Sequence, residues 1–514
     1  MANGYTQPQA ARQRPRRLIK NALFSSWEWG TTLLLAAVCI PYMVRRLTVE
    51  GFGIYTLFSG LIGYYALLDL GLGQGLVRFV SDYRARQDDE GISASINAAL
   101  CIQAIAGLTA SALLVLFADP ILGWLRIPSS FWTAAQSALR ASAVGFFFTM
   151  MSGTFSSVLM GLQRYDITSK VNVSTNTCLT LSIVAILFFG GGLLAVMCAT
   201  AISAVVVFTI YLIVVRRMLP TWRPAFQVNW TLLRSLLGFS FFLFVSRTSQ
   251  SFATYFMRFI VSAMLGPSAV TYYSVPMKIV IAFGGFLSSS AATLFPFASE
   301  MNAQGSGEAL RRVYLLASKY FVSLAVPVFA LMGIFSRQIL SLWMGSDFAA
   351  RASAPMVILC FGAVIGSTGT ISGLVALGVG RSRLLASFSL VSIALAASLA
   401  VPLIRAADVS GAAAAYLVAG LVWVAFQCYV AKSVFGLLVS AYFNQVYRFH
   451  ALAIVPLVGA ALLYQKLLGS LGSRGAFSAA VGGAILLSGY YGVSVLSRWT
   501  DVAELRRLVG VKAG

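Results

Sequence analysis

Residues 193–215 read LLAVMCATAISAVVVFTIYLIVV, and this stretch decides the fold class. It holds no charged side chain, and Arg216 and Arg217 follow it directly. A helix needs about 20 consecutive apolar residues to cross a bilayer core roughly 30 Å thick, so the stretch is long enough to be a membrane span. Of the 514 residues, 59% are hydrophobic and only 10% are charged. Because soluble domains carry about a quarter charged residues, the composition excludes a soluble enzyme and predicts an all-α polytopic membrane protein.

Similar apolar stretches predict about fourteen transmembrane helices with short loops between them. The expected organisation is a basic tail (1–20), an N-lobe of six spans (21–215), a connector (216–235), a C-lobe of six spans (236–435), two more spans (449–497) and a second tail (498–514). Residues 47–59, LTVEGFGIYTLFS, and residues 265–277, LGPSAVTYYSVPM, align with Leu and Tyr at the same places. This echo indicates two six-span lobes that run in the same direction, and chance similarity between apolar segments is the alternative.

The basic residues indicate the orientation of the chain in the membrane. The net charge is +22, from 37 Lys and Arg against 15 Asp and Glu. Most of the Lys and Arg residues fall in the two tails and in alternate loops, as expected for loops on the cytoplasmic side. The pattern therefore predicts that both termini are cytoplasmic and that the basic loops contact anionic membrane lipids. Nucleic acid is not an expected partner, because the basic residues are scattered between spans.

Metal and cofactor chemistry has few residues to draw on. The sequence has one histidine, His450, and six cysteines that lie in apolar runs without CxxC spacing. A zinc or haem site needs clustered ligands, so we expect no metal and no cofactor.

Three cations at membrane depth are the most informative residues, because a charge at the centre of a span costs about 2.5 to 3.5 kcal/mol on insertion scales. Arg247 and Arg258 are eleven residues apart in one predicted span, which places them on nearly the same helix face. Lys278 enters the next span to a similar depth. We predict that Arg247, Arg258 and Lys278 line a wet, cationic cavity that binds an anionic substrate. The alternative is that they snorkel or pair with acids.

Polar and acidic residues in other spans are further candidates. Glu28, between Trp27 and Trp29, is either a proton-coupling carboxylate or an interfacial residue. Asp69 is a second candidate for ion coupling, although its place before a helix also suits a capping role or pairing with Arg78. Polar side chains that line the cavity, or that simply join helices, are predicted at Asn172, Asn176 and Gln250.

Two segments carry a resemblance to a known family. Residues 21–85, which begin NALFSSWEWG and end QGLVRFVSDYRA, and residues 161–167, GLQRYDI, are similar to the bacterial polysaccharide (O-antigen) flippases. These belong to the multidrug/oligosaccharidyl-lipid/polysaccharide exporter superfamily, with the MATE antiporters and the lipid II flippases. The resemblance implies two six-helix lobes in a V around a central cationic cavity, with two extra C-terminal helices. It also implies an inner-membrane protein whose partners are an undecaprenyl-diphosphate-linked oligosaccharide, membrane lipids and other polysaccharide assembly proteins.

The expected function is therefore translocation of that lipid-linked oligosaccharide to the periplasmic leaflet by alternating access, and not catalysis. A MATE-like cation antiporter is the first alternative, but it would need carboxylates in the cavity where this chain offers mostly Arg and Lys. A membrane polysaccharide polymerase is the second alternative. It would need a large extracytoplasmic loop with catalytic groups, and the longest such loop, residues 119–140, offers one acid.

Overall fold

The computed structural model describes residues 7–63, 69, 71–225, 255–291, 294–469 and 475–497. In this part of the chain the regular elements are all helices, and nine of them are long and apolar enough to cross a membrane. The prediction of an all-α polytopic membrane protein is confirmed. The count of fourteen spans and the arrangement of two lobes in a V stay predictions.

The chain divides into two compact units. We call residues 31–274 and 389–409 the N-terminal unit, and residues 1–30, 275–388 and 410–514 the C-terminal unit. The helices of the first part of the chain are α1 (Gln7–Gly63), α3 (Leu72–Ala85), α4 (Asp89–Leu116), α5 (Ala118–Trp124), α6 (Trp132–Gly161), α7 (Tyr165–Phe188), α8 (Leu193–Met218) and the unlabelled helix Tyr255–Leu265, with a short 3₁₀ turn at Ser129–Phe131.

The helices of the second part are α10 (Pro267–Ala291), α11 (Leu294–Ala303), α12 (Gly307–Ile334), α13 (Ser336–Met344), α14 (Ser346–Gly378), α15 (Ser382–Phe435), α16 (Val439–Val446), α17 (Arg448–Gly469) and α18 (Gly475–Leu496). The boundary between the two units falls inside α10.

Two long helices contain a break at which the sequence predicts a loop between spans. The backbone of α1 is non-helical at Thr48, between the apolar stretches 22–43 and 52–70 of the sequence. That of α15 is non-helical at Ala407 and Asp408, between the apolar stretches 384–404 and 411–434. Each of these helices therefore consists of two helical segments.

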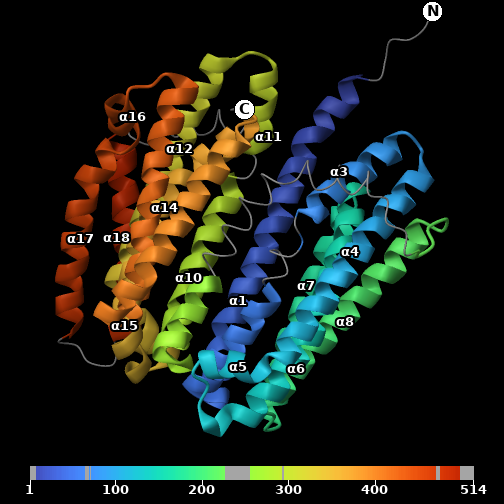
Figure 1. Cartoon of the computed structure of the whole chain (residues 1–514). Coiled ribbons are helices and arrows are strands. Elements are labelled where there is room, and N and C mark those ends of the chain that lie inside the picture. Colours follow the sequence, from blue (N-terminus) through green and yellow to red (C-terminus); the bar gives the residue numbers. More distant parts are fainter. Residues whose placement is uncertain are drawn as a thin grey trace, which may run out of the picture. The chain divides into compact units, whose positions relative to one another are not determined.

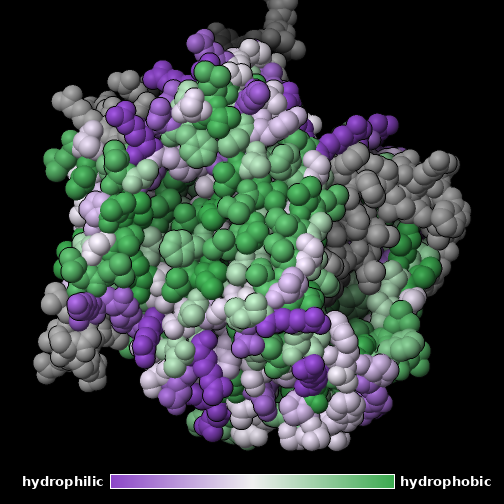
Figure 2. All heavy atoms as spheres, turned by 60° about the vertical axis from the view of Figure 1, so that its left-hand side comes forward, coloured by the Kyte–Doolittle hydropathy of each residue, from purple (hydrophilic) through white to green (hydrophobic). Residues whose placement is uncertain are grey.

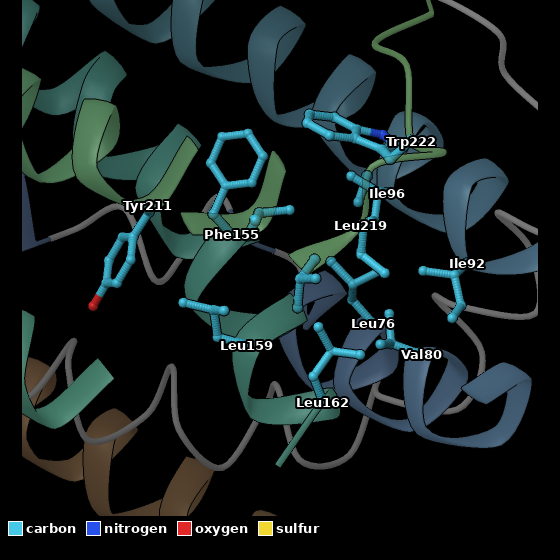
Figure 3. Packing of buried hydrophobic residues seen from close by; sticks show 13 residues of the cluster. Leu76, Val80, Ile92, Ile96, Phe155, Leu159, Leu162, Tyr211, Leu219 and Trp222 are labelled. Atoms are coloured by element: carbon cyan, nitrogen blue, oxygen red, sulfur yellow. The ribbon is translucent and has the colours of Figure 1, made fainter. Parts of the chain in front are cut away.

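In the N-terminal unit, α6 lies between α4 and α8, and α3 packs against α4 and α6 (Figure 1). Figure 3 shows the apolar core at one end of these helices, and it is closed by Leu219 and Trp222, which follow α8. The Trp222 ring meets the ring of Phe155 of α6 edge-on, with 5.8 Å between the ring centroids. Its indole N–H donates to Asn97 Oδ1 of α4 at 3.0 Å. The start of the predicted basic connector is thus part of a core.

In the C-terminal unit, α12 packs against α14 and against α17 of the last helix pair. His450 is 3% exposed, and its ring nitrogens contact Ser323 of α12 at 3.1 Å and Tyr490 of α18 at 2.5 Å. Tyr314 of α12 stacks between Phe435 and Tyr442. The contacts of His450 therefore join α17 to α12 and α18, and the aromatic stack joins α12 to α15 and α16.

The surface of the chain is apolar where a bilayer would cover it. Figure 2 shows a broad hydrophobic band on one face, with hydrophilic residues gathered along both of its edges. On α17, Leu452, Val455 and Leu463 are each about two-thirds exposed. Soluble monomers rarely expose so large an apolar area, so this band is a lipid-facing surface.

Candidate functional site

The candidate site residues form three features of the N-terminal unit, which are an acid–amide pair, a polar helix face and a buried arginine. Each lies in a helix that the apolar pattern assigns to the membrane or at the end of one.

Asp69 lies just before α3, and its carboxylate accepts hydrogen bonds from Gly73 and Gln103. Its two carboxylate oxygens accept the backbone N–H of Gly73, at 3.3 and 3.2 Å, which satisfies one of the unpaired N–H groups at the start of α3. This is the capping contact that the sequence position predicts. The carboxylate also accepts Nε2–H of Gln103, from α4, at 2.5 Å.

Gln103 is the buried member of this polar pair, and Asp69 is half-buried. Its side chain is 2% exposed, and within the described part of the chain its Oε1 atom has no hydrogen-bond donor. A buried acceptor without a donor is costly, so a further donor or a cation at this oxygen would be favourable. Ser157 of α6 also lies near this turn, since a Cβ atom added to Gly73 would come within 2.8 Å of its Oγ.

The second feature is the polar face of α7. Asn172 and Asn176 are exposed and stand four residues apart, so they share one face of the helix. Tyr211 of α8 donates its hydroxyl to Asn172 Oδ1 at 3.0 Å, which orients that amide. The hydroxyls of Thr175 and Thr180 donate back to carbonyls of α7 itself.

An exposed pair of amides in an apolar span does not suit hydrocarbon, because amide groups left without hydrogen bonds there cost several kcal/mol, about 4 to 8 on alkane scales. Only Thr168, Ile183 and Leu187 of α7 are buried. The amide face of α7 therefore suits water or a ligand rich in hydroxyl groups.

The third feature is Arg258, in the helix Tyr255–Leu265. Its side chain is 7% exposed, and its guanidinium carbon lies 5.2 Å from the centre of the Tyr255 ring. A cation over a ring face is attracted by about 0.5 to 2 kcal/mol. The membrane depth and the substrate-binding role of Arg258 stay predictions.

This helix is fixed to the N-terminal unit at both ends. Ser262 donates its hydroxyl to the Leu125 carbonyl at 2.7 Å, and Arg126 donates to the Met264 carbonyl at 2.7 Å. At the other end the Tyr255 ring lies so close to Gly63 that an added Cβ atom would come within 2.6 Å of its Cζ. The position of the ring below Arg258 therefore depends on a glycine in α1.

The other predicted site residues are placed as follows. Lys278 lies in α10, is half-buried and belongs to the C-terminal unit, whereas Arg258 belongs to the N-terminal unit. The predicted shared cavity wall stays a prediction. Arg247 and Gln250 lie outside the described residues, and Glu28 lies in α1 in a part whose side chains are not described.

Sequence reasoning missed Gln103, Tyr211 and Tyr255. Gln103 carried a signal, because it is a polar residue inside the apolar stretch 92–118. Tyr211 carried none, since a tyrosine in an apolar span is ordinary and its partner, Asn172, lies 39 residues away. Tyr255 stands three residues before Arg258 on the same helix, so that spacing carried a signal for the contact.

A family model described as "Polysaccharide biosynthesis protein" matches residues 18–302, which is more than half of the chain. The chain belongs to this family. All eight predicted site residues, from Glu28 to Lys278, lie within the matched range of this polysaccharide biosynthesis protein.

Relatives and solved structures agree with the family. A Shigella flexneri protein named "Putative O-antigen transporter" is 22% identical over 369 residues, which cover 72% of this chain and 87% of the relative. A Haloferax volcanii protein named "Probable low-salt glycan biosynthesis flippase Agl15" is 24% identical over 387 residues, covering 73% of this chain and 75% of the relative. The solved structure of the lipid II flippase MurJ, in an inward closed conformation, matches with a TM-score of 0.70, over 94% of this chain and 98% of MurJ. At 12% identity the likeness to MurJ shows the fold alone.

Proposed function

We propose that this polysaccharide biosynthesis protein is a flippase. It moves an undecaprenyl-diphosphate-linked oligosaccharide from the cytoplasmic to the periplasmic leaflet of the bacterial inner membrane by alternating access. The names of the two relatives support transport of a glycan, and the fold of MurJ supports transport of a large lipid-linked substrate.

The observation that carries the proposal is the buried Arg258 in the short apolar helix Tyr255–Leu265. A guanidinium forms paired hydrogen bonds with phosphate oxygens, so it suits the diphosphate of such a substrate. The amide face of α7 supplies donors and acceptors for sugar hydroxyls. The polyprenyl tail needs no polar partner and stays in the lipid.

The coupling of transport to an ion gradient is assigned to Asp69. A carboxylate that accepts Gln103 Nε2–H would, after protonation, donate to Gln103 Oε1 once that amide rotates. Protonation thus changes the contact between α3 and α4. An anionic substrate leaving a negative cytoplasm is also helped by the membrane potential, by about 2.3 kcal/mol per charge per 100 mV.

The test is surface polysaccharide in a strain that lacks the chromosomal copy and carries plasmid variants. Arg258→Ala should abolish surface polysaccharide while the protein stays at its normal level in the membrane, and Arg258→Lys should keep part of it. Arg140→Ala is the matched control, because Arg140 is an exposed arginine in the third turn of α6, and this variant should show normal surface polysaccharide. Normal polysaccharide in Arg258→Ala would remove this residue from the mechanism.

A further inference from the structure

A pocket of about 340 Å³ lies where α14 ends and α15 begins, outside the part of the chain that the family model matches. Its lining residues all belong to the C-terminal unit and are Gly380, Arg381, Ser382, Arg383, Leu384 and Tyr429. The lining contains two arginines, two hydroxyl groups and no acid. The pattern of basic loops places this turn on the cytoplasmic side of the membrane.

The turn that forms the pocket is specific in its backbone. Gly380 has φ = +78°, a conformation that costs little only for glycine, and its N–H donates to the Leu377 carbonyl. The Arg381 N–H donates to the Ala376 carbonyl at 2.8 Å, which closes α14. The chain then enters α15 at Ser382. Arg381 and Arg383 thus stand at the first turn of a helix.

The turn is anchored to the far end of α15. Nη1 of Arg381 donates to the carbonyl and to the hydroxyl of Ser433, each at 3.3 Å. The ring of Phe388 lies 5.9 Å from that of Tyr429, so the two segments of α15 also meet one turn further on. These contacts use one nitrogen of Arg381, and a guanidinium offers five N–H donors over three nitrogens.

The electrostatics of the pocket suit a strongly charged anion. Arg381 and Arg383 are both exposed, so their guanidinium groups can reach a ligand. The N-terminus of a helix adds roughly half a positive charge and its own N–H donors. The total exceeds two positive charges, which suits a diphosphate better than the single negative charge of a phosphodiester lipid.

An apolar stripe leads from the pocket along α15. Leu421, Ala425 and Tyr429 follow at intervals of four residues on one helix face, and all three are exposed. Leu421 is 48% and Tyr429 is 49% exposed. A hydrocarbon tail can lie on this stripe while its head group occupies the pocket, so the pocket fits a lipid better than a soluble anion.

We propose that the pocket formed by Arg381, Ser382, Arg383 and Tyr429 binds the diphosphate head group of a polyprenyl lipid at the cytoplasmic edge of the membrane. It is a docking site that the substrate reaches before it enters the transport path. The choice of a diphosphate lipid rests on the proposed function, whereas the anion site itself rests on the pocket.

The experiment measures lipid binding to the purified full chain in phosphatidylcholine nanodiscs. Undecaprenyl diphosphate without sugar is the probe, phosphatidylglycerol is the competing phosphodiester lipid, and native mass spectrometry counts the bound lipids. The double variant Arg381→Gln/Arg383→Gln should lose about ten-fold or more in affinity for the diphosphate lipid, since each lost charge-assisted hydrogen bond alone weakens binding about ten-fold. Arg381→Lys/Arg383→Lys should keep part of the affinity.

The matched control is Arg216→Gln/Arg217→Gln. These two exposed arginines stand at the C-terminal end of α8, so the variant removes the same charge from a helix end with the opposite dipole. It should bind within about two-fold of the wild type, since surface charges contribute little on their own. Equal losses in the two double variants, or equal binding of phosphatidylglycerol and the diphosphate lipid by the wild type, would show general attraction of anionic lipid and overturn the proposal.

A second measurement does not depend on arginine variants. The photo-crosslinking substitution Tyr429→benzoylphenylalanine in the otherwise wild-type chain should label undecaprenyl diphosphate, and absence of the crosslink overturns the proposal. The docking site and the proposed flippase function can each fail without the other. Loss of transport in Arg258→Ala with no lipid at the pocket would keep the flippase and remove the docking site, and the reverse pattern would do the opposite.

Discussion

Gly63→Ala is the most informative single change, because it perturbs Arg258 without touching any charge. The added Cβ atom would come within 2.6 Å of Tyr255 Cζ and 2.8 Å of its hydroxyl oxygen. Carbon atoms pack best at about 3.5 to 4.0 Å, so the ring has to move by about 1 Å or more. Arg258 lies over this ring, so its guanidinium has to follow or lose the contact.

The magnitude follows from two opposing effects. Overpacking a tight site costs about 1 to 3 kcal/mol. Replacing glycine by alanine within a helix stabilises it by up to about 1 kcal/mol. Gly60→Ala is the matched control, because it gains the same helix propensity on the same helix and its Cβ atom would meet the Tyr255 ring at an ordinary 3.5 Å.

The assays are thermal melting of the purified protein in detergent and surface polysaccharide in the complemented strain. We expect Gly63→Ala to melt several degrees below Gly60→Ala and to export about ten-fold less, as a loss of about 1.4 kcal/mol in binding would produce. Gly60→Ala should match the wild type in export. Equal melting and equal export of the two variants would refute the packing of Tyr255 against α1 and its link to Arg258.

Two further predictions concern the other features of the site. Asp69→Asn keeps an acceptor for Gly73 N–H but cannot take up a proton, so the protein level should stay normal and export should fall at every pH. Gln103→Leu should lower export less if Asp69 is the coupling group. Wild-type export in Asp69→Asn would discard the coupling role. Asn172→Leu/Asn176→Leu should make α7 more apolar and abolish export without loss of protein. Cys178→Leu, at an exposed position on the same helix, should show normal export. Equal effects on export at both sites would contradict a sugar-binding face.

The sequence predicted which segments are helices because apolar runs between charged or glycine-containing stretches decide that locally. The breaks at Thr48 and at Ala407–Asp408 fall inside the predicted loops for this reason. The lengths of the two breaks could not be predicted from the apolar pattern. Both breaks are so short that α1 and α15 continue directly from one helical segment into the next.

Contacts between residues far apart in the chain could not be predicted from the sequence pattern. Charge at membrane depth identified Arg258 and Asp69 as unusual, because that cost depends on the residue type alone. Nothing local indicated that Asp69 meets Gln103 of α4, or that Gly63 makes room for Tyr255. The pocket at Arg381 and Arg383 could not be predicted locally either, because it depends on the return of α15 to Ser433.

The most direct measurement is flipping of a fluorescent undecaprenyl-diphosphate-linked oligosaccharide by the purified chain in proteoliposomes. The account predicts that the wild type carries the lipid between leaflets, that Arg258→Ala does not, and that Arg258→Lys does so slowly. Equal flipping by wild type and Arg258→Ala would contradict a cationic path for the diphosphate through this protein.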